Sequence, residues 1–160
     1  MGISHISLAT GPARFAAVRA FYLAALAPLG YTAYIDRPDD GVLGLRPRDG
    51  PPDFWLHAGN GEQPDAFTAA GGEGAFDVEK RPGRAHVAFG AENPEVVDRW
   101  FEGAVKAGGI SNGAPGLRKY AATYYAAFVL DPLGNNIEVL YYSPETATTT
   151  TAEKTEWTMP

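Results

Sequence analysis

Apolar positions along this chain follow two spacings, which separate expected strands from expected helices. Alternation of apolar and polar residues predicts strands over 2–9, 31–36, 41–46, 53–57, 83–90, 124–130 and 136–142. Spacing of three to four residues predicts helices over 12–27 and 94–107, each beginning at a proline, as first helical turns often do. The remaining Gly- and Pro-rich stretches predict loops, including 113–117 and a long loop over 59–82 with a short helix near 65–70.

The order of these elements repeats, so the chain is interpreted as one βαβββ unit written twice. Aligning His5 with His86 gives an offset of 81 residues, and at that offset Pro12 and Pro94 agree within one position. We therefore predict one α+β structural domain made of two modules, residues 1–78 and 79–143. The Thr-rich segment 144–160 is predicted to be a tail.

Composition narrows the class of partner. The net charge of −6 argues against a nucleic-acid-binding protein, which needs a basic face, and no apolar run is long enough to span a bilayer. The chain has no cysteine, which excludes a thiolate metal site and suits a cytoplasmic protein. We expect a small-molecule partner, with no binding to nucleic acid or to a membrane.

Candidate chemistry centres on the three histidines, His5, His57 and His86, together with Glu138. Side chains alternate along a strand, and each of these four lies opposite the apolar residues of its own strand. The apolar face can pack on a helix, so the four polar side chains face either water or a pocket. For any single histidine, a hydrogen-bonded or exposed side chain is the simpler interpretation.

Symmetry and chemistry strengthen the functional interpretation. The offset that maps His5 onto His86 also maps His57 onto Glu138, although unequal loop lengths would shift the second pairing by a residue or two. Two imidazoles and a carboxylate form a facial ligand set for a divalent ion and leave positions open for a substrate. His5, His86 and Glu138 are therefore predicted to bind Fe(II), Zn(II), Ni(II) or Mn(II).

Several segments resemble the vicinal oxygen chelate superfamily, which includes glyoxalase I, extradiol dioxygenases and bleomycin-resistance proteins. These segments are ISHI near the start, GRAHVAF, NGAPGLR and YYAAFVLDPLGNNIEVL. The resemblance covers residues 2–143 and is most specific at the DPxGNxIE pattern that ends in Glu138. It implies that His5, His86 and Glu138 bind the metal. It also implies paired modules that form a curved mixed sheet around a cleft, with helices on the outer face, commonly in a homodimer.

The chain departs from glyoxalase I at one position. That enzyme has a second glutamate on the fourth strand, which binds the metal and transfers a proton. Here the position is occupied by His57, or by Trp55 on the same face. His57 is therefore a candidate fourth ligand or base, and a structural or exposed role remains an equal alternative.

Four further residues are candidates for contact with a substrate, and each has a simpler structural role as its alternative: Trp55, Arg118, Tyr120 and Tyr124. Arg118 would pair with an anionic group, and the aromatic side chains would line a pocket. Asn136 is interpreted as a structural residue at the start of a strand.

The sequence favours a metal-dependent glyoxalase- or dioxygenase-like enzyme acting on a small oxygen-chelating substrate. Isomerase or lyase chemistry beside a carbonyl is the first expectation, and oxygen chemistry follows if the ion is Fe(II). The alternative is a protein of the same fold that binds a drug or metabolite without converting it.

Overall fold

A computed structural model describes residues 3–58 and 85–143 of the chain. The first module holds β1 (Ile6–Thr10), α1 (Pro12–Ala25), η1 (Ala27–Leu29), β2 (Thr32–Arg37), η2 (Pro38–Asp40), β3 (Val42–Arg46) and β4 (Phe54–Ala58). The second holds β5 (His86–Gly90), α2 (Pro94–Lys106), β6 (Ile110–Leu117), β7 (Tyr125–Leu130) and β8 (Asn136–Tyr141). The predicted module boundary at 78/79, the short helix near 65–70 and the tail 144–160 lie outside the described residues.

Each module forms a four-stranded mixed sheet with the same topology. The strand orders are β1-β4-β3-β2 and β5-β8-β7-β6. In each sheet the first strand pairs in parallel with the last, and the other neighbours are antiparallel. The predicted α+β fold and the repeat of the βαβββ unit are thus confirmed.

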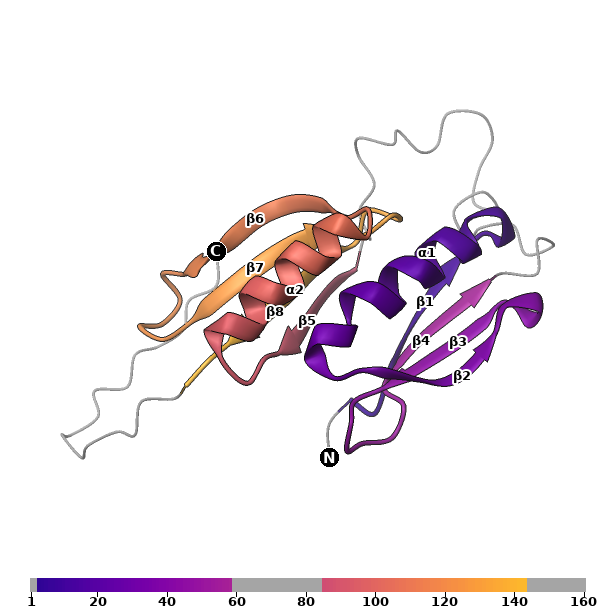
Figure 1. Ribbon diagram of the computed structural model, residues 1–160, viewed down its shortest axis with the longest axis horizontal. Helices are drawn as coiled ribbons and strands as arrows, with labels where there is room; N and C mark the ends of the chain where they lie inside the picture. The colour runs from indigo at the N-terminus through magenta and orange to yellow at the C-terminus, as the bar shows by residue number, and fades with distance from the viewer. Residues whose placement is uncertain (1–2, 59–84, 144–160) are drawn as a thin grey trace.

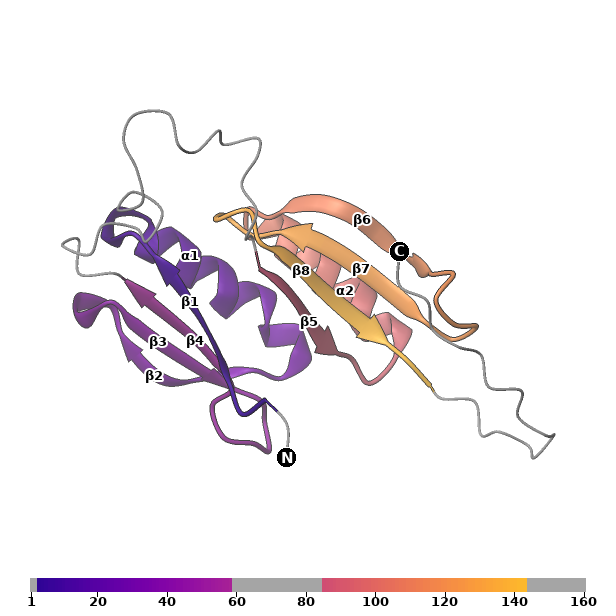
Figure 2. The same ribbon diagram turned by 180° about the vertical axis from the view of Figure 1, so that it is seen from behind.

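The two helices cover one face of the paired sheets and leave the other face open. Figure 1 shows α1 and α2 side by side in front of the strands, and in Figure 2 both helices lie behind the strands. Both helices start at a proline, and α2 is capped by Asn93, whose Oδ1 accepts a hydrogen bond from the amide of Val96 at 3.0 Å. None of the described helices is long and apolar enough to cross a membrane.

One apolar core joins the two modules. The rings of Phe54 and Phe89, one from each sheet, lie 5.7 Å apart, and Tyr22 of α1 packs on Phe54 at 4.6 Å. Trp100 of α2 is completely buried in the same cluster. Because aromatic side chains from both modules share this core, neither helix–sheet unit buries its apolar face alone.

Two features differ from the sequence prediction. Residues 113–117, predicted as a loop, belong to strand β6, which pairs with β7 through two register shifts. The two sheets also remain separate rather than forming one continuous curved sheet. Strands β1 and β5 are edge strands that face each other at the centre of the molecule, without pairing in the described residues (Figure 2).

Candidate metal centre on the open sheet face

The open face of the second sheet brings His86 and Glu138 together. Strand β5 pairs with β8 so that Ala88 lies opposite Glu138, and His86 opposite Asn136. The Nε2 atom of His86 lies 3.0 Å from Oε2 of Glu138. The glutamate is only 4% exposed although it points away from the helices, whereas the imidazole is half-exposed. A buried carboxylate beside an accessible imidazole nitrogen is a donor pair suited to a divalent ion.

Tyr124 holds the second oxygen of this carboxylate. Its hydroxyl donates a hydrogen bond to Oε1 of Glu138 at 2.7 Å. Burial, together with the hydrogen bond and negative charge of Glu138, raises the pKa of Tyr124 to about 12. The hydroxyl therefore keeps its proton at neutral pH and acts as a donor that orients Glu138.

An aromatic and a cationic side chain extend the same face. The ring of Phe128 stacks beside the imidazole of His86, with centroids 6.4 Å apart, and the guanidinium of Arg118 lies over Phe128 at 5.1 Å. Arg118 also donates hydrogen bonds from Nη2 to the carbonyl oxygens of Ala114 and Ala126. These contacts support the structural alternative for Arg118, because the side chain joins β6 to β7.

His5 does not join the His86–Glu138 pair within the chain. It precedes β1 instead of lying in it, is exposed, and is bonded through Nδ1 to the hydroxyl of Ser4 at 3.0 Å. Both His5 and His86 line a cavity of about 470 Å³, formed by residues 3–6 and 86–90 with Tyr31 and Asp53. Within residues 3–58 and 85–143, however, no three His, Asp or Glu side chains are close enough to hold one ion.

Strand register places Trp55, and not His57, at the position equivalent to Glu138. Ile6 lies opposite Phe54 in the first sheet, as Val87 lies opposite Ile137 in the second, so the next residues, Trp55 and Glu138, correspond. The pairing of His57 with Glu138 by a constant offset is therefore wrong. The loops within the two modules differ in length, which moves the fourth strand by two residues.

Trp55 and His57 form an aromatic surface on the open face of the first sheet. Their rings are nearly parallel, with centroids 6.1 Å apart, and His57 is exposed. The six-membered ring of Trp55 takes the space above Gly44, where a Cβ atom would lie only 2.7 Å from Cζ3. Glycine at position 44 thus allows the indole to pack against the neighbouring strand.

Tyr120 stands at the rim of the second sheet. It is 71% exposed and packs edge-to-face against Tyr124, with ring centroids 5.4 Å apart. Of the predicted substrate-contact residues, Tyr120, Tyr124 and Arg118 therefore lie in the β6–β7 connection of the module that carries His86 and Glu138. Trp55 lies on the other sheet.

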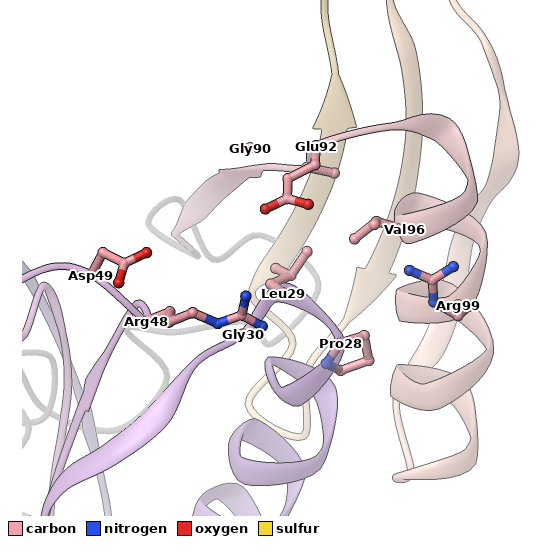
Figure 3. Close-up of a pocket in the computed structure, with 10 residues that line it drawn as sticks. Pro28, Leu29, Gly30, Arg48, Asp49, Gly90, Glu92, Val96 and Arg99 are labelled. Carbon is pink, nitrogen blue, oxygen red and sulfur yellow. The ribbon is translucent and has the colours of Figure 1, made fainter.

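A second, smaller hollow of about 220 Å³ lies apart from these residues. It is formed between η1 and the β3–β4 loop of one module and the start of α2 in the other (Figure 3). Arg48 and Glu92 border it from opposite sides, and none of the predicted site residues lines it. It therefore belongs to a different part of the surface.

The sequence analysis did not identify Phe128 as a residue of this face, and it gave Asn136 only a structural role. The side-chain amide of Asn136 lies 2.8 Å from Nδ1 of His86, and Phe128 is paired directly with Glu138 across β7 and β8. Position 136 is two residues before Glu138 on one strand, so alternation alone would have placed both side chains on one face.

The chain is thus an α+β protein built from two paired βαβββ modules, with a His–Glu pair on the open sheet face. The family model described as "Glyoxalase/Bleomycin resistance protein/Dioxygenase superfamily" matches residues 35–139. The chain belongs to this superfamily, as its motifs indicated.

Solved structures agree on the fold. A glyoxalase-related enzyme from Fulvimarina pelagi superposes with a TM-score of 0.63 at 18% identity, covering 89% of this chain and 88% of that one. A glyoxalase/bleomycin resistance protein from Albidiferax ferrireducens T118 superposes with a TM-score of 0.59 at 20% identity, covering 88% of this chain and 98% of that one. Lactoylglutathione lyase from Agrobacterium tumefaciens superposes with a TM-score of 0.55 at 19% identity, covering 88% of this chain and 92% of that one. A search of curated proteins finds no match.

Proposed function

We propose that this protein is a divalent-metal-dependent enzyme acting on a small substrate that chelates the metal through oxygen. The observation that carries the proposal is the His86–Glu138 pair, with 3.0 Å between Nε2 and Oε2 on the open face. A buried carboxylate is costly unless it is paired or binds a cation, and here its two oxygens meet one imidazole and one tyrosine hydroxyl. The donor types fit Fe(II), Zn(II), Ni(II) or Mn(II).

The third ligand in this proposal is His5. Because His5 does not reach the pair within one chain, we propose a homodimer in which the second copy supplies it. The exposure of His5 supports this arrangement, and so does the open face of each sheet. The same contact would bring Trp55 near the substrate.

A bound ion would supply positive charge that stabilises negative charge on a substrate oxygen. The protein's own residues orient the ligands and keep water from the site. Tyr124 keeps its hydroxyl proton and fixes the orientation of Glu138, while Phe128 forms an apolar wall beside His86. His57 lies two residues beyond the position equivalent to Glu138, so we assign it proton transfer rather than metal binding. Isomerase or lyase chemistry beside a carbonyl then remains the leading reaction, with oxygenation if the ion is Fe(II).

A second candidate is a binding protein that sequesters a small molecule without converting it. It is favoured by the cavity of about 470 Å³ that Tyr31 and Phe89 help to line, because aromatic walls bind apolar ligands without a metal. In this case His86 and Glu138 would be a structural hydrogen-bonded pair.

The two functions separate by metal binding. Untagged, metal-stripped protein is titrated with Zn(II), Ni(II), Mn(II) and, without oxygen, Fe(II), by calorimetry and elemental analysis. The enzyme proposal expects one ion per site and loss of binding in His86→Ala and Glu138→Gln. Equal and weak metal uptake by the wild type and both variants would contradict the enzyme proposal and favour the binding protein. Loaded protein is then assayed with thiol hemiacetals and with catechols.

A mixing experiment tests the shared site. His5→Ala and Glu138→Gln are each expected to bind metal poorly. Unfolded and refolded together, they form mixed dimers in which one site has all three ligands, so about half of the sites in those dimers regain tight binding. No recovery in mixed dimers, shown to form by mass spectrometry, would mean that His5 and Glu138 do not meet across a dimer.

A further inference from the structure

Asp53 has an unpaired carboxylate oxygen at the wall of the larger cavity. Its main chain is held in place, because its carbonyl oxygen accepts from the amide of Ile6 at 2.8 Å and its amide donates to the carbonyl of Leu45 at 3.2 Å. In the side chain, Oδ2 accepts from the hydroxyl of Tyr31 at 3.0 Å. The other oxygen, Oδ1, is buried and has no hydrogen-bond partner in the described part of the chain. A buried carboxylate oxygen is unfavourable until a donor meets it.

The chain itself does not neutralise this carboxylate. Burial, and then the negative charge of Asp53, raises the pKa of Tyr31 above its ordinary value, so the hydroxyl keeps its single proton and gives it to Oδ2. No lysine or arginine lines the cavity. Among the residues that the structure describes, Asp53 also belongs to no group of three side chains that could hold a metal ion. A cationic donor in the cavity would therefore meet an acceptor that is already in place.

The cavity has the size and the apolar walls of a site for a small organic molecule. Its volume is about 470 Å³, and small-molecule sites usually measure about 300–1,000 Å³. Tyr31 and Phe89 form its aromatic part, with ring centroids 5.6 Å apart in an edge-to-face arrangement. Ile3 lines the cavity as well and is 87% exposed. A cation is attracted by aromatic rings, and an apolar body would cover Ile3.

Strand β5 adds a main-chain acceptor to the same cavity. The amide of Asn136 donates to the carbonyl of Ala85, and the amide of Ala91 donates to the carbonyl of Leu140. Peptide groups alternate in direction along a strand, so the carbonyl of Ala88 points away from β8, toward the side on which β1 lies (Figure 2). Ala88 lines the cavity. A primary ammonium group has three hydrogens, and this carbonyl can accept one that the carboxylate does not.

We propose that this cavity binds a small organic ammonium ion with an apolar body, whose ammonium group donates to the carboxylate of Asp53. Either carboxylate oxygen can turn toward the ligand, because the terminal torsion of an aspartate is broad. The net charge of −6 favours the approach of a cation. The inference rests on the second function proposed above, binding in this cavity, and it does not require a metal at His86 and Glu138.

Three probes of one shape separate charge from apolar contact. The protein as purified is titrated by calorimetry with phenethylamine as its ammonium ion, with neutral phenethyl alcohol and with anionic phenylacetate. We expect the ammonium ion to bind at least about tenfold more tightly than the other two, the size of one hydrogen bond to a charged group. Absence of phenethylamine binding, or equal binding of the amine and the alcohol, would overturn the inference.

Asp53→Asn removes the charge but keeps the side-chain volume and an oxygen that accepts from Tyr31. Phenethylamine affinity should fall about 10- to 100-fold, while the affinity for phenethyl alcohol should not change. Asp49→Asn is the matched control, because it makes the same change in charge at an exposed residue that does not line this cavity. Equal losses in the two variants would show an effect of net charge alone and would contradict a contact with Asp53.

A measurement on the wild type keeps the inference testable if Asp53→Asn does not fold. Nuclear Overhauser effects should connect phenethylamine protons with the methyl groups of Ile3 and the ring of Tyr31. Effects confined to residues outside the cavity would overturn the inference. Metal uptake, measured separately, distinguishes the two proposals. Phenethylamine binding without metal uptake would overturn only the metal-dependent enzyme, and metal uptake without phenethylamine binding would overturn only the ammonium site.

Discussion

The hydroxyl of Tyr22 on α1 donates a hydrogen bond to Oδ2 of Asp131, 109 residues further along the chain, at 2.5 Å. Asp131 is buried in the β7–β8 turn and also accepts from the backbone amides of Leu133 and Asn135 and from the side chain of Asn135. The aspartate of the DPxGNxIE motif therefore shapes its own turn and fastens that turn to the other module. The strand that begins just after this turn carries Glu138.

Replacing Tyr22 by phenylalanine should destabilise the protein. The change keeps the ring in the core but removes one donor from a buried carboxylate, so we expect the free energy of unfolding to fall by about 1–3 kcal/mol. Urea denaturation of the wild type and variant measures it. Tyr125→Phe is the control, because Tyr125 donates to Asp98 at 2.8 Å near the surface and should change stability by less than about 1 kcal/mol. Equal losses of stability in the two variants would mean that the Tyr22–Asp131 hydrogen bond contributes no more than the one at the surface.

The same bond predicts how stability depends on alkaline pH. Burial, and then the negative charge of Asp131, raises the pKa of Tyr22 far above its ordinary value of about 10. In the unfolded chain this hydroxyl loses its proton near pH 10, whereas in the folded protein it does not. The contribution of the Tyr22–Asp131 hydrogen bond to the free energy of unfolding is thus fully present below about pH 10 and declines above it. Tyr22→Phe should show a shallower loss of stability between pH 9 and 11; an identical slope would contradict the assignment.

Gly44→Ala should disturb Trp55. The new Cβ would lie 2.7 Å from the indole, so the ring must move, and we expect a loss of about 1–3 kcal/mol, as for other overpacked sites. Unfolding by urea and a shift in tryptophan emission report it. Gly116→Ala on β6 is the matched control, since a Cβ there meets nothing within 4 Å. If both variants behave alike, the packing of Trp55 on Gly44 is unimportant.

Arg118→Lys distinguishes a structural arginine from a substrate-binding one. Lysine keeps the charge but cannot make the contacts of Arg118 with Ala114, Ala126 and the Phe128 ring together. We expect the free energy of unfolding to fall by about 1–2 kcal/mol. Stability unchanged, with weaker binding of an anionic ligand, would instead favour the substrate role.

His57→Ala should keep the Zn(II) affinity of the wild type, whereas His86→Ala removes a ligand and should lose more than the roughly 10- to 100-fold that removal of a ligand's hydrogen-bonding partner costs. The physical reason is register, which puts Trp55 at the position that corresponds to Glu138. Calorimetry on metal-stripped proteins measures both. A loss in His57→Ala as large as that in His86→Ala would make His57 a ligand.

The sequence predicted what local rules control. Alternation placed His86 and Glu138 on the face away from the helices, and Pro12 and Pro94 marked the helix starts. Prediction from the sequence failed where pairing between distant segments determines the structure. Strand β6 has glycine, serine and proline in place of typical strand residues, and it forms because β7 pairs with it and Phe128 packs over Gly113. The position of His5 depends on how modules, or copies, meet, which no local pattern records.

The bond between Tyr22 and Asp131 occurs on one side of the repeat only. Aligning the two helices at Pro12 and Pro94 pairs position 22 with Ala104, a small buried residue that has no hydroxyl. The halves have therefore diverged into complementary parts and can no longer be exchanged. A chain built from two first halves would have Tyr22 twice but no Asp131, and one built from two second halves would bury Asp131 twice without Tyr22.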